Sequence, residues 1–527
     1  MGACSSREWL SIVADAVEQT DGSAPAIRQF IETQLGVEAG GSKRPMAVAF
    51  AAGVAELAQY AGGPWNEERT AVEEEREALE VARRAVCPIL EARLQGRIDQ
   101  LDAVWNGCSR CDKCGGPVES KGRRERGWGS TLGGLSLSRR YVHCEECGQG
   151  GSPALKAIGL PKGHFTAHLE EVATLMATTV PYEMACALLS KLCGVELSKK
   201  ALEGMTEERG RAVLEQLEAD AERFAPYDES GLPKPTPVVP PPDPEMESAA
   251  ETDVAYIEMD GVLPITREEV PLSELSDKDR EQLEEAKQAK ARGGKARRYT
   301  IVGREVKNAV LYTAADCAQE SPQRGCLLRK RYVSLLGTWT AFAALLWVEL
   351  TRLRFERAKL VVILSAGADW IRSLAAWLPF EPLLILDLYH VEHRVLEVAH
   401  LLWGQGSARA QCWAHEQYAR IEADQALMVI DALRFITPPT QKAAEKVDEL
   451  KTYLRNNLDR MHHPVYRAHG LRISSAAVES ANFHVTGQRL ECQGMRWDEQ
   501  GAREMAALRA DLFNGRWEAT TKQLLAA

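Results

Sequence analysis

Four cysteines form the strongest chemical signal in the sequence. They make two pairs, each with two intervening residues: Cys111 and Cys114, then Cys144 and Cys147. Two thiolates on a tight turn can face one tetrahedral zinc ion, and four thiolates complete a structural site. Cys108 competes for a ligand position, and two turns of unliganded thiols are the alternative. We predict a zinc ribbon over residues 106–152 that holds a structural Zn²⁺.

Acidic residues follow predicted strands in the second half of the chain. Asp260 ends the predicted strand 254–259, and Asp387 follows the apolar stretch 383–386. An aspartate at the end of a strand in an α/β sheet lies where ligands bind, although Asp-Gly also marks turns. A third apolar stretch, 360–364, leads into Ala366, and Glu479 lies at the start of a predicted helix.

The segments around these residues, taken in order, resemble one family. They are similar to the DDE transposases of bacterial insertion sequences, in particular the Kra-type group, which is akin to the Mutator superfamily. The resemblance extends over residues 105–515. The matching segments are 259–262, 304–307, 366–371, 387–393, 478–480, 488–490 and 494–497.

The resemblance implies an RNase H-like core interrupted by a helical insertion at 394–470. It also implies three carboxylates that hold two Mg²⁺ or Mn²⁺ ions. Asp260 matches the first aspartate of the motif and Glu479 matches the glutamate, so both are the expected magnesium ligands. Asp387 and His390 match the group's Asp-x-x-His motif, which supports the site, with His390 in a structural or DNA-contacting role.

The second aspartate of the motif is replaced here by Ala366. Hard cations need carboxylate oxygens, and an alanine methyl group offers none. Asp369 lies one helical turn further on and is expected to point elsewhere. We therefore expect this chain to cleave and join DNA poorly or not at all. An engineered Asp→Ala change that traps a DNA complex and natural loss in a degenerate or repurposed copy both give this sequence.

Three further residues are candidate DNA contacts. Predicted helices at 184–192 and 198–205 are joined by a short turn, a pattern that is typical of a helix-turn-helix and also of a plain helical hairpin. Lys199 and Lys200 begin the second helix and are the expected DNA-binding residues. Arg489 follows Glu479 and is interpreted either as a phosphate contact or as part of a surface salt bridge.

The composition bounds the partners of the protein. The chain has 527 residues and a net charge of −11, so a nucleic-acid surface must be local. Basic stretches occur at 121–126, 139–140 and 287–298. No apolar run approaches the roughly 18 residues of a membrane span. We expect a bacterial cytoplasmic protein that associates with the nucleoid when it binds DNA, and no membrane partner.

The order of segments predicts a multidomain α/β protein: an RNase H-like mixed sheet with a helical insertion, preceded by a zinc ribbon and helical regions for DNA binding and dimerisation. The predicted parts are a helical region and possible dimerisation arm at 1–105, the ribbon at 106–152, a helix-turn-helix-like region at 153–224, a Pro-rich linker at 225–250, and the core at 251–393 and 471–527 around the insertion at 394–470.

The expected function is a DNA transposase that binds the ends of its insertion sequence and target DNA as a homodimer or larger assembly. Two alternatives remain at this stage. One is a non-catalytic DNA-binding protein derived from a transposase, for which Ala366 is natural. The other is a metal-dependent nuclease without strand transfer.

Overall fold

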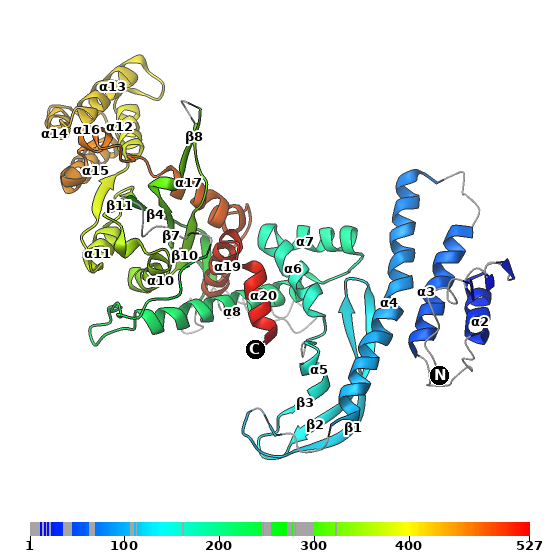
Figure 1. The fold of residues 1–527 in the computed structure, drawn as a ribbon. Coiled ribbons are helices and arrows are strands. Elements are labelled where there is room, and N and C mark those ends of the chain that lie inside the picture. The colour runs from blue at the N-terminus through cyan, green and yellow to red at the C-terminus, as the bar shows by residue number, and fades with distance from the viewer. Residues whose placement is uncertain are drawn as a thin grey trace. The chain divides into compact units, whose positions relative to one another are not determined.

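The computed structural model divides into two compact units, residues 1–205 with 521–527, and residues 206–520 (Figure 1). The described ranges are 23–34, 45–62, 69–105, 110–160, 163–246, 254–270, 299–321 and 324–526, apart from Asp112 and Glu245, together with a few isolated positions. The basic stretch 287–298 and Cys108 lie outside the described residues. None of the described helices is long and apolar enough to cross a membrane.

The first unit begins with helices α2 (Ala24–Gln34), α3 (Pro45–Gly62) and α4 (Ala71–Ala103). Helix α4 continues through Pro88 without a break. A capping box between Thr70 and Glu73 begins α4.

The ribbon in the first unit consists of β1 (Val118–Ser130), β2 (Gly133–Cys144) and β3 (Gly150–Gly151). Strand β2 pairs antiparallel with β1, and three polar side chains of α4 cover its other edge. They contact alternate main-chain amides at 2.6–2.8 Å: Glu91 with Ser136, Gln95 with Ser138, and Asp102 with Arg140. These contacts satisfy backbone donors that an open strand edge would expose.

After the ribbon come α5 (Pro153–Ala157), α6 (Ala167–Thr179), α7 (Tyr182–Leu188), the π-turn η1 (Leu189–Cys193) and α8 (Lys199–Phe224). Gly194 ends η1 with a positive φ of 63°, and the Ser198 hydroxyl accepts a hydrogen bond from the Ala201 amide. The turn between the two predicted helices therefore has a glycine where the first ends and a capping serine where the second begins.

The second unit is built on a five-stranded mixed sheet in the order β10-β7-β4-β11-β12. Strand β7 is antiparallel to both β4 and β10, whereas β11 runs parallel to both β4 and β12. The predicted mixed α/β fold is confirmed. The strand bounds are β4 Val254–Val262, β7 Val306–Thr313, β10 Arg331–Leu336, β11 Leu360–Ser365 and β12 Leu383–Leu386.

Helices cover both faces of this sheet. Residues Ala255, Ile257 and Met259 of β4 share one core with α10 (Trp339–Arg352) and α11 (Asp369–Trp377). The opposite face packs against α17 (Ala476–Ala481) and the π-helical turn η6 (Asn482–Gly487). Because side chains alternate along a strand, Tyr256, Glu258 and Asp260 belong to the face that meets α17.

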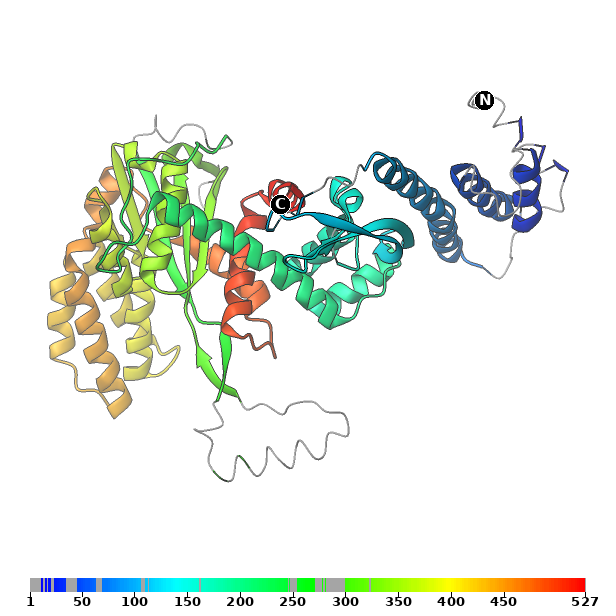
Figure 2. The ribbon, with the colours of Figure 1, turned by 90° about the horizontal axis from the view of Figure 1, so that it is seen from below.

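Of the five α-helices between β12 and α17, the first four share a separate core, and the group lies at one side of its unit in Figure 1 and Figure 2. This location agrees with the expected helical insertion at 394–470, although the first of these helices begins before it. The helices are α12 Leu388–Trp403, α13 Ala408–Glu422, α14 Ala426–Arg434, α15 Gln441–Asn457 and α16 His463–Ala468.

The remaining elements of the second unit are short or lie near its C-terminal end. They are β5 Ile265–Glu269, β6 Tyr299–Gly303, η3 Ala314–Asp316, β8 Cys317–Ser321, β9 Arg324–Leu327, η4 Phe355–Arg357, η5 Leu458–Arg460, α18 Gln488–Leu490, α19 Glu499–Phe513 and α20 Trp517–Ala526. Strands β5 and β6, like β8 and β9, make two-stranded antiparallel ribbons.

The described part of the Pro-rich segment is packed against the second unit. Asp243 forms a buried, two-pronged ion pair with Arg331 of β10, with N–O distances of 2.7 and 2.9 Å. Arg354 also donates to the Pro240 carbonyl at 3.2 Å. The sequence prediction of a linker did not anticipate this anchor, and the predicted domain boundaries stay predictions.

Replacement of this anchor tests the packing. D243N removes a charged partner of the buried Arg331, so we expect the free energy of unfolding to fall by about 3 kcal/mol. E416Q, in the exposed Arg420–Glu416 pair, is the control and should change it by less than about 0.5 kcal/mol. Denaturant titration measures both, and equal small effects would contradict a packed segment.

Candidate functional site

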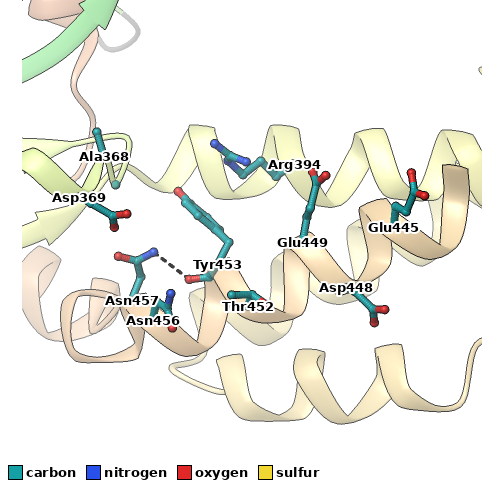
Figure 3. Close-up of a pocket in the computed structure, with 11 residues that line it drawn as sticks. Ala368, Asp369, Arg394, Glu445, Asp448, Glu449, Thr452, Tyr453, Asn456 and Asn457 are labelled. Carbon is teal, nitrogen blue, oxygen red and sulfur yellow. Dashed lines mark hydrogen bonds between the residues drawn. The ribbon is translucent and has the colours of Figure 1, made fainter.

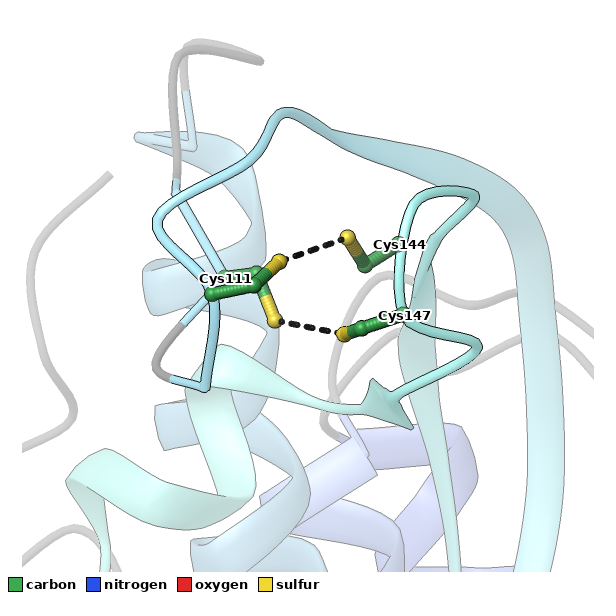
Figure 4. A group of neighbouring side chains, drawn as sticks. Cys111, Cys144 and Cys147 are labelled. Atoms are coloured by element: carbon green, nitrogen blue, oxygen red, sulfur yellow. Dashed lines mark hydrogen bonds between the residues drawn. The ribbon is translucent and has the colours of Figure 1, made fainter.

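The four predicted zinc ligands come together in the ribbon (Figure 4). Their sulfur atoms all lie within 4.8 Å of one another, with Cys111–Cys147 at 3.4 Å and Cys114–Cys144 at 3.5 Å. Each pair stands on the same kind of turn, in which a glycine with φ near 70° donates its amide to the carbonyl of the first cysteine. The two glycines are Gly115 and Gly148.

This sulfur cluster fits a structural zinc ion. Four sulfurs at 2.3 Å from a tetrahedral zinc are about 3.8 Å apart, close to the spacing seen here. Main-chain amides of Cys114 and Lys113 lower the pKa of Cys111 to about 7. At Cys114, a main-chain hydrogen bond from Gly116 is outweighed by hydrogen bonds with Cys144 and Cys147, which raise the pKa, so Cys111 is the readier of the two to become the thiolate that a metal requires. Because four protein ligands close the coordination shell, the cluster suits a structural role and leaves no position for a substrate.

Zinc removal should unfold the ribbon. We expect one zinc per chain by elemental analysis, and C114S should lose it and expose β1 and β2 to protease. C186S, in α7 of the same unit, removes a cysteine outside the cluster and should retain the metal. Equal zinc content in the two variants would contradict the assignment.

A second group of ionisable side chains, mainly carboxylates, lies near the C-terminal end of the central strand β4. Asp260 ends the buried part of β4, and the Asn482 side-chain amide donates to its Oδ2 at 2.7 Å. Glu479 of α17 lies 3.2 Å from His390 of α12, measured from Oε1 to Nε2. Burial raises the pKa of Asp260, and burial and then the charge of Asp260 raise the pKa of Glu479. The two predicted magnesium ligands therefore belong to one electrostatic neighbourhood.

Ala366 lies directly after β11, whose last residue Ser365 is paired with Met259 of β4. Continuing this parallel register by one residue places Ala366 beside Asp260 on the neighbouring strand. Asp369 begins α11 instead and lines an open pocket of about 680 Å³ between the β11–α11 loop and the insertion (Figure 3). Asp369 is thus on the side of the loop that faces α15.

Asp387 is almost fully buried, and its carboxylate binds the start of α12 and the residue that precedes α17. Its carboxylate accepts hydrogen bonds from the His390 amide at 2.9 Å, from the Ser475 hydroxyl at 2.6 Å and from the Ser475 amide. His390 Nδ1 lies 3.5 Å from the same carboxylate. Although burial opposes ionisation, the hydrogen bonds from His390 and Ser475 lower the pKa of Asp387 to about 2. A supporting role fits these contacts.

Glu258 is a site residue that the sequence analysis missed. It is completely buried on β4, two residues before Asp260, and accepts hydrogen bonds from the amides of Ala477 at 2.7 Å and Val478 at 3.0 Å. The Tyr312 hydroxyl is a third donor. Its only signal in the sequence is an acidic residue within an otherwise apolar strand.

The candidate DNA contacts lie in different environments. Lys199 and Lys200 are exposed at the start of α8, as expected, and their contact with DNA stays a prediction. Arg489 is not at the surface, which contradicts the surface salt bridge, whereas a phosphate contact stays a prediction. It is completely buried, with its guanidinium 4.8 Å from the centre of the Trp497 ring.

The role of Asp387 can be tested by stability. D387N removes charge-assisted acceptors from buried donors, so we expect a loss of about 2–3 kcal/mol near neutral pH. The wild-type carboxylate titrates near 3.9 when unfolded and near 2 when folded, so its contribution disappears as the pH falls from about 4 towards 2. Denaturant titrations of both proteins should converge over this range, and a constant difference would contradict the assignment.

Comparison with known proteins gives two findings. Residues 329–523 match the family described as an uncharacterised protein family, UPF0236. The matched stretch contains Ala366, Asp387 and Glu479 and leaves out Asp260 and the cysteine cluster. Among solved structures, a Drosophila P element transposase strand transfer complex is similar at 10% identity and a TM-score of 0.20, covering 70% of this chain and 83% of that one. No curated protein matches the chain.

Proposed function

We propose that this protein is a DDE-type DNA transposase of the Kra-type group whose second catalytic position is occupied by Ala366. The observation that carries the proposal is that three elements meet near the C-terminal ends of the neighbouring strands β4 and β11. Strand β4 brings Asp260, the adjacent β11 leads directly into Ala366, and α17 adds Glu479 through its contact with His390. These are the positions of the three carboxylates in the resembled family.

The topology of the sheet supports an RNase H-like core. The first strand of the sheet, β4, is central, the next two are antiparallel additions on one side, and the last two are parallel additions on the other. This is the strand order expected of that fold. The insertion follows the fifth strand and precedes the helix that carries Glu479.

The carboxylates suit hard divalent cations. Asp260 and Glu479 would hold Mg²⁺ or Mn²⁺, whose chemistry in such sites is activation of the attacking oxygen and stabilisation of the leaving oxygen. His390 and Asn482 hold these carboxylates in place through the contacts already described. The methyl group of Ala366 provides no ligand, so the set is incomplete and the chain is impaired in cleavage and strand transfer.

The first unit would recognise DNA. In this proposal the zinc ribbon and the helices around Gly194 bind the ends of the insertion sequence, with Lys199 and Lys200 against phosphates. Joining two ends and a target requires at least two subunits, and such a protein would work in the bacterial cytoplasm at the nucleoid. A non-catalytic DNA-binding protein derived from a transposase is the second candidate, and Ala366 is the observation that favours it.

Restoring the carboxylate tests the proposal. A366D should cleave and join DNA that carries the element's ends in Mg²⁺ or Mn²⁺ about 10²-fold or more faster than the chain with Ala366, since a metal stabilises the transition state by several kcal/mol. A368D is the matched control, because it adds the same charge two residues away, at the N-cap of α11, where aspartate is favourable.

The outcomes separate the candidates. Cleavage and joined products with A366D alone support the transposase, and cleavage without joining favours a nuclease. DNA binding without cleavage in either variant favours the non-catalytic protein. Equal cleavage by A366D and A368D would contradict the assignment of position 366.

A further inference from the structure

The helical insertion contacts the loop that carries residue 366. Tyr453, near the end of α15, donates a hydrogen bond from its hydroxyl to the main-chain carbonyl of Ala366 at 2.9 Å. Burial raises the pKa of Tyr453 to about 12, so the hydroxyl keeps the proton that it donates. The contact involves the backbone of residue 366, and it therefore does not depend on which side chain stands there.

Gly367 lets the tyrosine ring lie against this loop. Its φ is +98°, a conformation that residues with a side chain rarely adopt. A Cβ atom at this position would lie 3.0 Å from Cε2 of Tyr453 and 3.1 Å from Cδ1 of Leu386. The glycine therefore combines a required backbone conformation with a close approach from the insertion.

The tyrosine is itself held in place, as Figure 3 shows. The guanidinium of Arg394 on α12 lies 4.3 Å from the centre of the ring, and the Asn457 side chain donates to the Tyr453 carbonyl at 2.7 Å. Arg372 of α11 bonds both carboxylate oxygens of Asp459, at 2.7 and 3.0 Å. Asp459 belongs to η5, directly after α15, so this part of the insertion is tied to the β11–α11 loop by Tyr453 and to α11 by Asp459.

We propose that Tyr453 and Gly367 are positioning residues, through which the insertion sets the direction in which residue 366 faces Asp260. The proposal rests on the function proposed above and assigns part of the insertion to the geometry of the metal site. The contact between Tyr453 and the backbone of residue 366 is present in this chain, although the Ala366 side chain carries no carboxylate.

The first test uses the chain with Ala366 and needs no activity. Y453F removes only the hydroxyl, so hydrogen exchange at the amides of Gly367 and Ala368 should accelerate about two- to tenfold, the range that one net hydrogen bond corresponds to. Y418F is the control, because Tyr418 packs on the same insertion core and its hydroxyl makes no hydrogen bond to another described residue. Unchanged exchange in the loop, or equal acceleration throughout the insertion, would overturn the proposal.

The second test measures metal affinity. In the A366D background, Y453F should weaken Mn²⁺ binding about two- to tenfold by calorimetry, while Y418F should leave it unchanged. G367A should weaken it similarly, and its effect should not add fully to that of Y453F, since both act on one contact. Equal Mn²⁺ affinity in all variants would overturn the role in the metal site. If exchange changes as expected but A366D neither binds Mn²⁺ nor cleaves DNA, the loop contact stands and the proposed function fails.

Discussion

Two buried carboxylates hold the beginning of α17 against the sheet, and the geometry of the acidic site depends on them. Glu258 accepts from the amides of Ala477 and Val478, and Asp387 accepts from Ser475. The amides of Ser475, Ala477 and Val478 have no acceptor within the helix, and negative charge is favourable at a helix N-terminus. Glu479 follows immediately in the chain. The contacts of Glu258 and Asp387 therefore govern the distance between Glu479 and Asp260. Glu258 and Asp387 are themselves unsuited to bind a metal, because their oxygens already accept hydrogen bonds.

In the first unit, side chains of helix α4 likewise accept hydrogen bonds from backbone amides, here along one edge of strand β2. A strand edge exposes a row of backbone groups, and in the ribbon the side chains of Glu91, Gln95 and Asp102 bind them from a helix. Polar residues on one face of α4 thus replace a missing strand. The sulfur cluster lies at the far end of the same hairpin strands, so the helix and the cysteines stabilise different parts of one ribbon.

Local features were predictable from the sequence, and long-range ones were not. The spacing of the cysteines predicts their cluster because each pair is confined to one turn. The resemblance indicated Asp260, Ala366 and Glu479; the first two follow from neighbouring strands of the sheet, and Glu479 lies on α17 in contact with His390. Glu258 and Tyr453 went unnoticed because their partners lie 219 and 87 residues away, and no local pattern marks such pairs. The burial of Arg489 was not predicted, because its sequence neighbourhood gives no sign of the Trp497 ring that lies against it.

The position of the insertion has a consequence for how the molecule folds. The Asp387–Ser475 contact joins residues 88 positions apart, with a helical core of its own in between. Bringing such distant residues together has an entropic cost that grows with the length of the loop, but the cost falls once the intervening chain has collapsed into a compact body. The acidic site is therefore a late product of folding, assembled only after the insertion has brought the ends of β12 and α17 within reach.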